Sequence, residues 1–564
     1  MTIESMKNIQ FPEHTYDEWK QAAQAALKGK DFDKVMKTPT IEDITLEPLY
    51  TESMLERTVS DVDAQTATVQ SGKFQTSWIV AQEIAADDAE TFLTLTKDDL
   101  ARGNEAIVYT SAHPFDWSDA QLEELAALIA RYPIYFKIIE EQDPILRVFK
   151  MLTTEQQEQV QGVIHGAGTI EAPPKVRTQL IDTLPTHNAG GTIIHELGVA
   201  LSMMAETLKE QSFHQAADQF WVRFAVDTHF FQEIAKLRAF RVLWQAFGSA
   251  YGEQSPRIPI FTETSVRSYS KLDPYVNLLR AGNATFSAVL AGTDGHTVHP
   301  HDFLTVPTPS SRRIARNVQL VIKEESHVSH VTDAAGGSYF IESLTRQYVE
   351  AAWNYFCEIQ DAGGYSEVKR TGWLTDDIQA KWLEREQQVA KRKTSLIGTN
   401  VYANPQEPVK DAKIDPAHLE YMTAKRLATP FEKLRAQSRE TTIKSAIILL
   451  EPLKAVKPQV DFVQGFLSVA GIEPEISPYL SSADEVNRFI HSEELDYAVL
   501  CGSQETLDKI VPGLKPQTAI DVAGKLDSET LASWQVHGVR DTLHTGKPLI
   551  DKLKDVLSLG KEAL

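Results

Sequence analysis

The chain has 564 residues, of which 42% are hydrophobic and 24% are charged, as is usual for a globular protein, and its length predicts about three domains. Its net charge of -22 argues against nucleic acid or an anionic membrane as a partner, because both attract positively charged proteins. Cys357 and Cys501 are too few for a disulfide scaffold or a cysteine metal site, and they favour a reducing compartment.

Residues 1–40 are polar, and Trp19, Ala22, Ala23 and Ala26 recur there at helical spacing. We expect this segment to be an N-terminal arm, either docked on another chain or packed on the larger unit of its own chain. It lacks the basic and apolar stretches of a signal peptide, and no apolar run in the chain approaches transmembrane length. The sequence therefore predicts a cytoplasmic protein.

Short apolar runs alternate with amphipathic helices over residues 41–385. The clearest helix spans about 228–247, and we expect Lys236, Arg238 and Arg241 on its solvent side. Strand–helix units over this length predict a parallel (β/α)8 TIM barrel. The expected strands are SWIVAQEI (77–84), EAIVYT (105–110), PIYFKII (133–139), QLIDTL (179–184), FWVRFAVD (220–227), PIFTET (259–264) and FSAVLAG (286–292).

A polar, proline-containing stretch makes residues 386–440 the expected linker. Residues 441–564 then form a smaller α/β unit, in which five strand–helix pairs predict a flavodoxin-like sheet. Ser482 and Glu485 form the pattern of a capping box before a helix. Further strands are expected at DYAVLCGS (496–503) and QTAIDVAG (517–524).

The first strand of this smaller unit is the apolar run 447–450, and the turn after it is where such sheets bind ligands. That turn reads EPLKAVKP, residues 451–458. It has no glycine to let the backbone approach a phosphate, and no His or Asp to ligate a metal. Pro458 is expected in the first turn of the following helix, which Gly471 ends.

Few residues of the larger unit suggest catalysis. His195 and Glu196 begin a zinc-protease-like H-E-x-x-H pattern, but Val199 stands where the second ligand is needed. The stretch 334–344 has adjacent glycines without the G-x-G-x-x-G spacing of a dinucleotide site.

Histidines near expected strand ends are the remaining candidates. His296, His299 and His301 could ligate a metal or could hydrogen-bond as ordinary turn residues. His187 is placed for a general acid, although a lone loop histidine is more often structural.

Three long stretches resemble the methylmalonyl-CoA mutase family. They are RFAVDTHFFQEIAKLRAFRVLW (223–244), SSRRIARNVQLVIKEESHVSHVTDAAGGSYFIESLT (310–345) and PFEKLR (430–435), and Trp19 and EPLYT (47–51) extend the similarity toward the N-terminus. The resemblance implies a (β/α)8 barrel that binds acyl-CoA, followed by a flavodoxin-like domain that binds cobalamin.

The sequence departs from catalytic members of that family at the cobalamin turn. Those members carry D-x-H-x-x-G, whose histidine coordinates cobalt, and this chain has Leu453, Ala455 and Pro458 at the three positions. Neither leucine nor alanine can ligate cobalt or support a ligating imidazole.

The barrel departs in the same direction. The family's substrate-contacting R-Q-Y-x-G-F corresponds to Ser77–Gln82, and His187 stands two residues away from the position of the family's catalytic histidine. The family's H-S-Q-T-S becomes Phe261–Ser265, in which Glu263 places a carboxylate where the family has an amide. A negative charge is unfavourable beside a CoA thioester and its phosphates.

These departures resemble the small subunit of heterodimeric mutases, which keeps both folds and has lost the sites. The resemblance implies a non-catalytic chain with no catalytic, cofactor-binding or metal-binding residues. Its expected partner is the catalytic large subunit, which carries adenosylcobalamin and interconverts methylmalonyl-CoA and succinyl-CoA. Two alternatives remain open: a stand-alone acyl-CoA mutase or lyase that uses His187 and Glu263 without cobalamin, and a scaffold or chaperone for a cobalamin enzyme.

Overall fold

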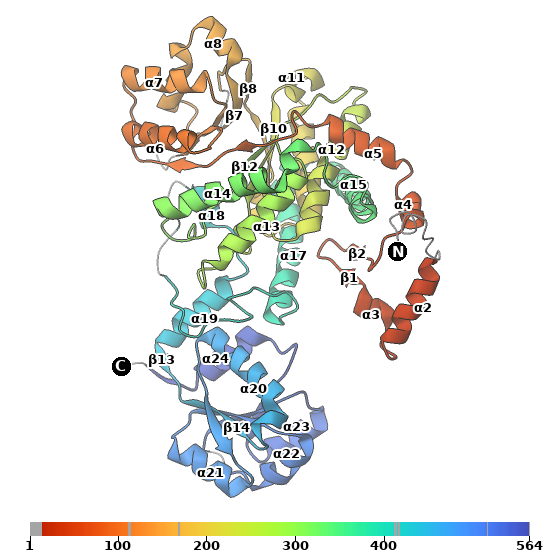
Figure 1. The fold of residues 1–564 in the computed structure, drawn as a ribbon, viewed down its shortest axis with the longest axis vertical. Coiled ribbons are helices and arrows are strands. Elements are labelled where there is room, and N and C mark those ends of the chain that lie inside the picture. The colour runs from red at the N-terminus through yellow and green to blue at the C-terminus, as the bar shows by residue number, and fades with distance from the viewer. Residues whose placement is uncertain are drawn as a thin grey trace, which may run out of the picture.

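The computed structural model describes residues 14–110, 114–166, 168, 170–410, 414, 418–515 and 517–562. It shows a mixed α/β protein with three five-stranded parallel sheets, two in the larger upper lobe of Figure 1 and one in the lower lobe. The predicted alternation of strands and helices is confirmed. No helix in the described ranges combines the length and apolar character that crossing a bilayer requires.

Two sheets form the centre of the larger lobe, and all their strand pairs are parallel. The first has the order β4 (Ile84–Ala85), β5 (Ile107–Thr110), β6 (Ile134–Lys137), β7 (Gln161–His165), β8 (Lys175–Arg177). The second has the order β3 (Ile79–Val80), β12 (Gly295–Thr297), β11 (Ile260–Thr264), β10 (Phe220–Val226), β9 (Gln179–Asp182).

Two chain segments connect these sheets. The expected strand at 77–84 is split, so that β3 pairs with β12 in one sheet and β4 pairs with β5 in the other. In the same way, β8 pairs with β7, and β9, which begins two residues after β8 ends, pairs with β10.

Helices surround the two sheets (Figure 1). They are α4 (Glu52–Thr58), α5 (Val62–Ser71), α6 (Ala89–Ala101), α7 (Asp119–Ile129), α8 (Thr154–Gln159), α9 (Leu184–Asn188), α10 (Ile193–Thr207), α11 (Phe213–Ala217), α12 (Phe230–Ala250), α13 (Val276–Leu290), α14 (Pro309–Ser326), α15 (Tyr339–Asp361), α16 (Tyr365–Thr371) and α17 (Trp373–Ala390).

One expected strand is wrong, and two strands of the larger lobe, β7 and β8, were missed. The run 286–292 lies mostly in α13, where the small side chains of Ala284 and Ala288 are buried, and the strand is β12 instead. A short apolar run fits a buried helix as well as a strand, which explains the error. In β7, Gly162 has φ 142° and an added Cβ would lie 2.0 Å from the backbone oxygen of Ile134.

Helix α12 confirms the predicted helix, but its cations are not on the solvent side. Lys236, Arg238 and Arg241 are at most 2% exposed. Each is paired with buried carboxylates from other elements, as in the ion pair of Arg241 with Asp294 at 3.2 Å. Helical periodicity identifies the apolar stripe, but it cannot reveal that the opposite face also meets neighbouring elements that supply counter-charges.

The N-terminal arm extends away from the larger lobe (Figure 1). It contains α2 (Tyr16–Ala26), α3 (Phe32–Met36) and the hairpin of β1 (Thr38–Pro39) with β2 (Thr45–Leu46). Trp19 packs edge-on against Phe32 with ring centroids 6.1 Å apart, yet α2 contains no buried residue. Among the residues that the structure describes, few therefore cover the apolar side of α2.

The lower lobe contains one sheet with the order β15 (Glu475–Tyr479), β14 (Ser445–Leu449), β16 (Tyr497–Cys501), β17 (Ala519–Ala523), β18 (Val539–Leu543). Its helices are α20 (Leu453–Leu467), α21 (Ala483–Ser492), α22 (Gln504–Ile510), α23 (Ser528–Gln535) and α24 (Leu549–Leu557), and a short ladder joins β13 (Thr441–Thr442) to β19 (Lys561–Glu562). Ser482 caps α21 by accepting from the backbone N–H of Glu485, as expected. Pro458 is not in the first turn, because α20 already begins at Leu453.

Helix α19 (Thr429–Arg439) lies between the lobes in Figure 1, and the short helix α18 (Leu419–Met422) lies against the larger lobe. Helix α19 packs against α24 of the lower lobe, whereas α18 contributes side chains to the centre of the larger lobe.

Candidate functional site

The carboxyl ends of the strands in the larger lobe carry a buried network of charges. Lys137 ends β6, and its Nζ lies 2.9 Å from Glu83 Oε1 and 3.3 Å from Glu263 Oε2 on β11. Arg223 on β10 donates two hydrogen bonds to Asp182, at 3.0 and 2.7 Å. Catalytic groups of strand–helix barrels lie at this end of the strands, so this network occupies the expected position of an active site.

Helix α18 closes this end of the sheets with three polar side chains. Glu420 accepts hydrogen bonds from both terminal nitrogens of Arg223, at 3.0 and 2.9 Å. Tyr421 donates to Glu263 and also contacts His299 Nε2 at 2.9 Å. His418 Nε2 lies 2.8 Å from Glu83 Oε2. Glu420 and Tyr421 therefore occupy the space beside Arg223 and Glu263 at this end of the sheets.

The protonation states follow from burial and the two cations. Burial opposes ionisation of Glu420, but Arg223 and Lys137 hold its pKa at about 2. Burial raises the pKa of Glu263 despite the same two cations. Burial and the nearby Glu263 keep the pKa of Tyr421 well above its usual value, so its hydroxyl remains a hydrogen-bond donor.

An aromatic layer lies next to the charged network. The rings of Tyr135, Trp221 and Phe261 contact one another, with centroids 5.3 to 5.7 Å apart. They form one buried cluster with Val163 and three smaller residues of the neighbouring strands. Side chains of the same strands therefore fill the interior between the two ends of the sheets.

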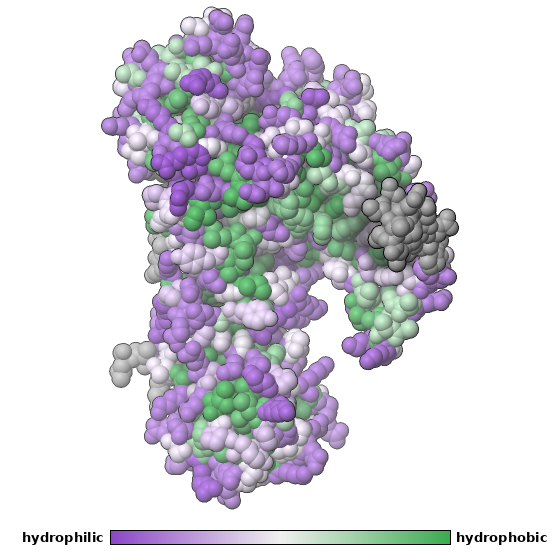
Figure 2. All heavy atoms as spheres, in the orientation of Figure 1, coloured by the Kyte–Doolittle hydropathy of each residue, from purple (hydrophilic) through white to green (hydrophobic). Residues whose placement is uncertain are grey.

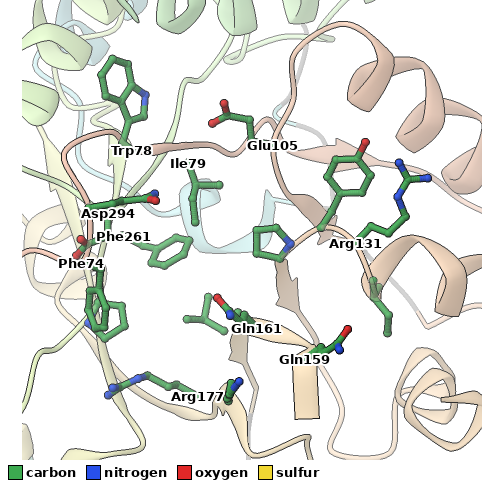
Figure 3. A pocket seen from close by; sticks show the side chains of 18 of the residues that line it. Phe74, Trp78, Ile79, Glu105, Arg131, Gln159, Gln161, Arg177, Phe261 and Asp294 are labelled. Atoms are coloured by element: carbon green, nitrogen blue, oxygen red, sulfur yellow. The ribbon is translucent and has the colours of Figure 1, made fainter. Parts of the chain in front are cut away.

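A cavity of about 950 Å³ opens at the opposite, amino-terminal ends of the strands (Figure 3). Phe261 and Ile79 point toward its centre, and Arg131 and Arg177 lie at its margin. Because Phe261 belongs to both the cavity lining and the aromatic layer, the cavity ends at that layer. A smaller cavity of about 200 Å³ lies near His299 and His418.

His187 is part of a buried Ser–His–Glu arrangement. Its Nε2 lies 2.7 Å from Ser265 Oγ, and its Nδ1 lies 2.8 Å from Glu196 Oε1. This order resembles a nucleophilic triad, and burial lowers the pKa of His187 well below the usual value, which keeps the ring neutral. However, Glu196 is also paired with Lys236, and neither of the two cavities described above is lined by any of these residues. The side chains of His187 and Glu196 are each 1% exposed, so the arrangement is closed to solvent.

The other candidate histidines contact different residues and do not converge on one site. His195 Nε2 lies 2.9 Å from Asp377 Oδ2, and His296 Nδ1 lies 2.7 Å from Thr262 Oγ1. The ring of His301 stacks on Tyr275 with centroids 5.2 Å apart. Within the described ranges, no three His, Cys, Asp or Glu side chains are grouped so that they could hold a metal ion.

In the lower lobe, the turn after β14 provides no ligand for a cobalt cofactor. Leu453 and Ala455 are exposed in the first turn of α20, and Pro458 follows within the same helix. Glu451 instead reaches the start of α22, where its carboxylate accepts from the backbone N–H of Ser503 at 2.9 Å and from Thr506 Oγ1 at 2.8 Å. The sheet order changes direction between β14 and β16, and this carboxylate spans the crevice at that point. The residues present do not fit a histidine-ligated cobalamin.

The stretch at 310–345, which resembles the family motif, contributes ion pairs to the larger lobe. Asp333 and Glu342 both accept hydrogen bonds from the buried Arg238 of α12. Gln65 of α5 donates to the same Glu342 carboxylate at 2.6 Å. This motif therefore joins three helical segments, and from its first half Lys323 lines the larger cavity and Arg312 lines the smaller one.

The sequence reasoning missed the charged residues at the carboxyl ends of the strands. Lys137 and Arg223 stand inside the apolar runs PIYFKII and FWVRFAVD. A charge in the middle of a buried strand requires a counter-charge, and this signal could have identified both residues. Glu420 and Tyr421 gave no comparable signal, because they lie in the polar segment expected to be a linker.

Comparisons with known proteins agree with this architecture. The family model described as methylmalonyl-CoA mutase matches residues 164–467, more than half of the chain. The methylmalonyl-CoA mutase small subunit of Porphyromonas gingivalis is 26% identical over 97% of this chain and 97% of its own length. The small subunit of Streptomyces virginiae is 32% identical over 62% of this chain and 60% of its own length. A methylmalonyl-CoA mutase of Cereibacter sphaeroides is 26% identical over 76% of this chain and 70% of its own length. The chain belongs to the methylmalonyl-CoA mutase family.

Proposed function

We propose that this chain is a non-catalytic subunit that pairs with and stabilises a catalytic large subunit of methylmalonyl-CoA mutase. The observation that carries the proposal is the filled strand end of the larger lobe, where Glu420 and Tyr421 bind Arg223 and Glu263. The names of the relatives support it, because they include small subunits from several bacteria.

In this proposal the two sheets of the larger lobe form one (β/α)8 barrel. The segments 79–85 and 175–182 each contribute to both sheets, so each counts as one strand and the two five-stranded sheets together have eight. The continuity of 79–85 and 175–182 across both sheets supports a closed ring of strands. The lower lobe is a flavodoxin-like domain, and the strand order β15-β14-β16-β17-β18 supports this assignment. The arm, barrel, linker and smaller domain then correspond to residues 1–40, 41–385, 386–440 and 441–564.

Adenosylcobalamin and the radical isomerisation of methylmalonyl-CoA and succinyl-CoA belong to the large subunit in this proposal. Leu453 and Ala455 support the absence of cobalt ligation by this chain. The alternative of a stand-alone enzyme using His187 and Glu263 is not favoured, because these side chains belong to separate buried networks.

Two exposed apolar surfaces support the binding of a protein partner. Helix α2 presents Trp19 and its small residues without burying any of them. Figure 2 shows a hydrophobic band across the middle of one face, over α13 and α14, where Leu279 and Val321 are 73% and 58% exposed. Obligate interfaces are large and apolar, and such surfaces are suited to them.

The test is co-expression with a candidate large subunit, followed by co-purification and an isomerase assay. Deleting residues 1–38 should weaken association more than it lowers the melting temperature of this chain alone, because α2 contributes little to its own core. Trp19→Ala should weaken association in the same direction, whereas Val536→Ala, which removes an 83% exposed apolar side chain of the lower lobe, serves as the matched control.

Two outcomes would contradict this proposal. If the truncated chain co-purifies in full stoichiometry but melts far earlier, the arm is internal packing. If the large subunit folds and turns over equally well without this chain, a subunit role is wrong, and association without any effect on turnover would favour a scaffold.

A further inference from the structure

The carboxylate of Glu420 is held as a bound ligand would be held. Arg223 Nη1 and Nη2 donate to its two oxygens at 3.0 and 2.9 Å, and Lys137 Nζ lies 3.5 Å away. The two cationic side chains are only 1% and 7% exposed. A paired-donor fork of this kind is the standard geometry for recognising a carboxylate.

The neighbouring carboxylates do not replace Glu420. Asp182 occupies Nε and Nη2 of Arg223, and Glu263 lies 3.9 Å from Nη1, beyond hydrogen-bond distance. Among the residues that the structure describes, Glu420 is therefore the hydrogen-bond acceptor of Nη1. Glu83 pairs with Lys137 on the other side of the network. Removing the Glu420 carboxylate would leave a buried donor unsatisfied, which is unfavourable.

Glu420 enters this centre from outside the strand framework. It lies on α18, far from Arg223 along the chain, and its side chain is 28% exposed, so the position is open to solvent on one side. His418 and Tyr421 attach the same short helix to Glu83 and Glu263. The carboxylate site thus belongs to the strands, and its occupant belongs to the segment between the lobes.

We propose that α18 acts as an intramolecular ligand that occupies a carboxylate-binding centre made by Arg223 and Lys137. The chemical class that this centre accepts is a small monocarboxylate. The Glu420→Ala change removes one CH₂ and the carboxylate, which together have the size of acetate, and formate is smaller. Propionate has one carbon more than the vacated space and would meet the Cβ of the alanine. The inference is independent of the proposed subunit role, because it concerns the isolated chain.

The experiment measures thermal unfolding of the purified Glu420→Ala variant in sodium acetate and in sodium chloride at equal ionic strength. We expect a saturable rise of the melting temperature with acetate, because a ligand that binds only the folded state stabilises it in proportion to ln(1 + [L]/Kd). At acetate concentrations ten times Kd, the ratio of folded to unfolded protein should increase about tenfold. Formate should act similarly, and propionate and butyrate should have much weaker effects.

The matched control is Glu420→Gln, which keeps the volume of the side chain and leaves no space for acetate. Neither this variant nor the unaltered chain should respond to acetate more than to chloride. If acetate and chloride act equally on Glu420→Ala, Glu263 or water has satisfied Arg223, and the inference is wrong. An equal acetate response of all three proteins would also overturn it.

If Glu420→Ala does not fold without additives, the same carboxylate series is applied during refolding. Recovery of folded protein with acetate but not with chloride or butyrate supports the inference. Recovery that does not depend on the carboxylate contradicts it.

Discussion

Replacing Arg238 by methionine should destabilise the larger lobe more than any single surface change. Arg238 is fully buried between Asp333 and Glu342, which are 2% and 0% exposed. Removing one partner of a buried ion pair typically costs about 3–5 kcal/mol, since the remaining charge loses its compensation. Glu342 would keep the hydrogen bonds from Gln65 Nε2 at 2.6 Å and from the Gly337 N–H at 3.0 Å. We therefore expect a loss near the lower end, about 3 kcal/mol.

Urea unfolding of the isolated chain, followed by tryptophan fluorescence and circular dichroism, measures this loss. Two probes are needed because a two-lobed protein can unfold in more than one step. Arg370→Met is the matched control, because Arg370 is 72% exposed and pairs only with the neighbouring Glu367. If Arg238→Met unfolds at the same urea concentration as this control, the ion pairs of Arg238 with Asp333 and Glu342 do not stabilise the fold. The structural role assigned to the 310–345 motif would then be wrong.

Three further predictions follow from the buried histidines and the lower lobe. Burial lowers the pKa of His296 and His299 to about 3, so below about pH 6.5 the unfolded state binds protons that the folded state does not. The free energy of unfolding should then fall as the pH drops from 6.5 toward 3, by up to about 1.4 kcal/mol per pH unit for each histidine. The urea midpoint of His296→Asn should depend less steeply on pH than that of the unaltered chain. An absorbance titration of the isolated chain with adenosylcobalamin should show no base-off, histidine-ligated spectrum, and micromolar binding with that spectrum would refute the assignment. The triple variant Leu453→Asp, Ala455→His, Pro458→Gly should still show no isomerase activity, because Glu420 and Tyr421 occupy the charged strand ends of the larger lobe, and substantial turnover would show that this lobe is functional.

The positions of most strands follow from local sequence, because a strand covered on both faces needs a continuous apolar run. The same rule placed a strand at 286–292, where alanine-rich α13 satisfies the burial requirement equally well. It also missed β7, since Gly162 and polar neighbours interrupt the run. Local sequence pattern identifies which segments are buried. It is a weaker guide to whether a buried segment is a strand or a helix.

The filled centre of the larger lobe was not predictable in this way. Its chemistry depends on Arg223 meeting Glu420, a contact between residues 197 positions apart in the chain. Single-sequence patterns contain no information on such pairs, and the polar composition around Glu420 is typical of a linker. The ligand turn of the lower lobe is different, because the exposed Leu453 and Ala455 could be identified directly from their positions in a motif.

Two of the three buried cations of α12, Arg238 and Arg241, also constrain the order in which this protein can mature during synthesis. The carboxylates that neutralise Arg241 and Arg238 follow 53, 95 and 104 residues later in the chain, at Asp294, Asp333 and Glu342. Until the ribosome has released these residues, α12 cannot enter the interior without uncompensated charge. The nascent larger lobe therefore remains open past residue 342, and chaperone contacts during this interval should concentrate on the apolar stripe of α12.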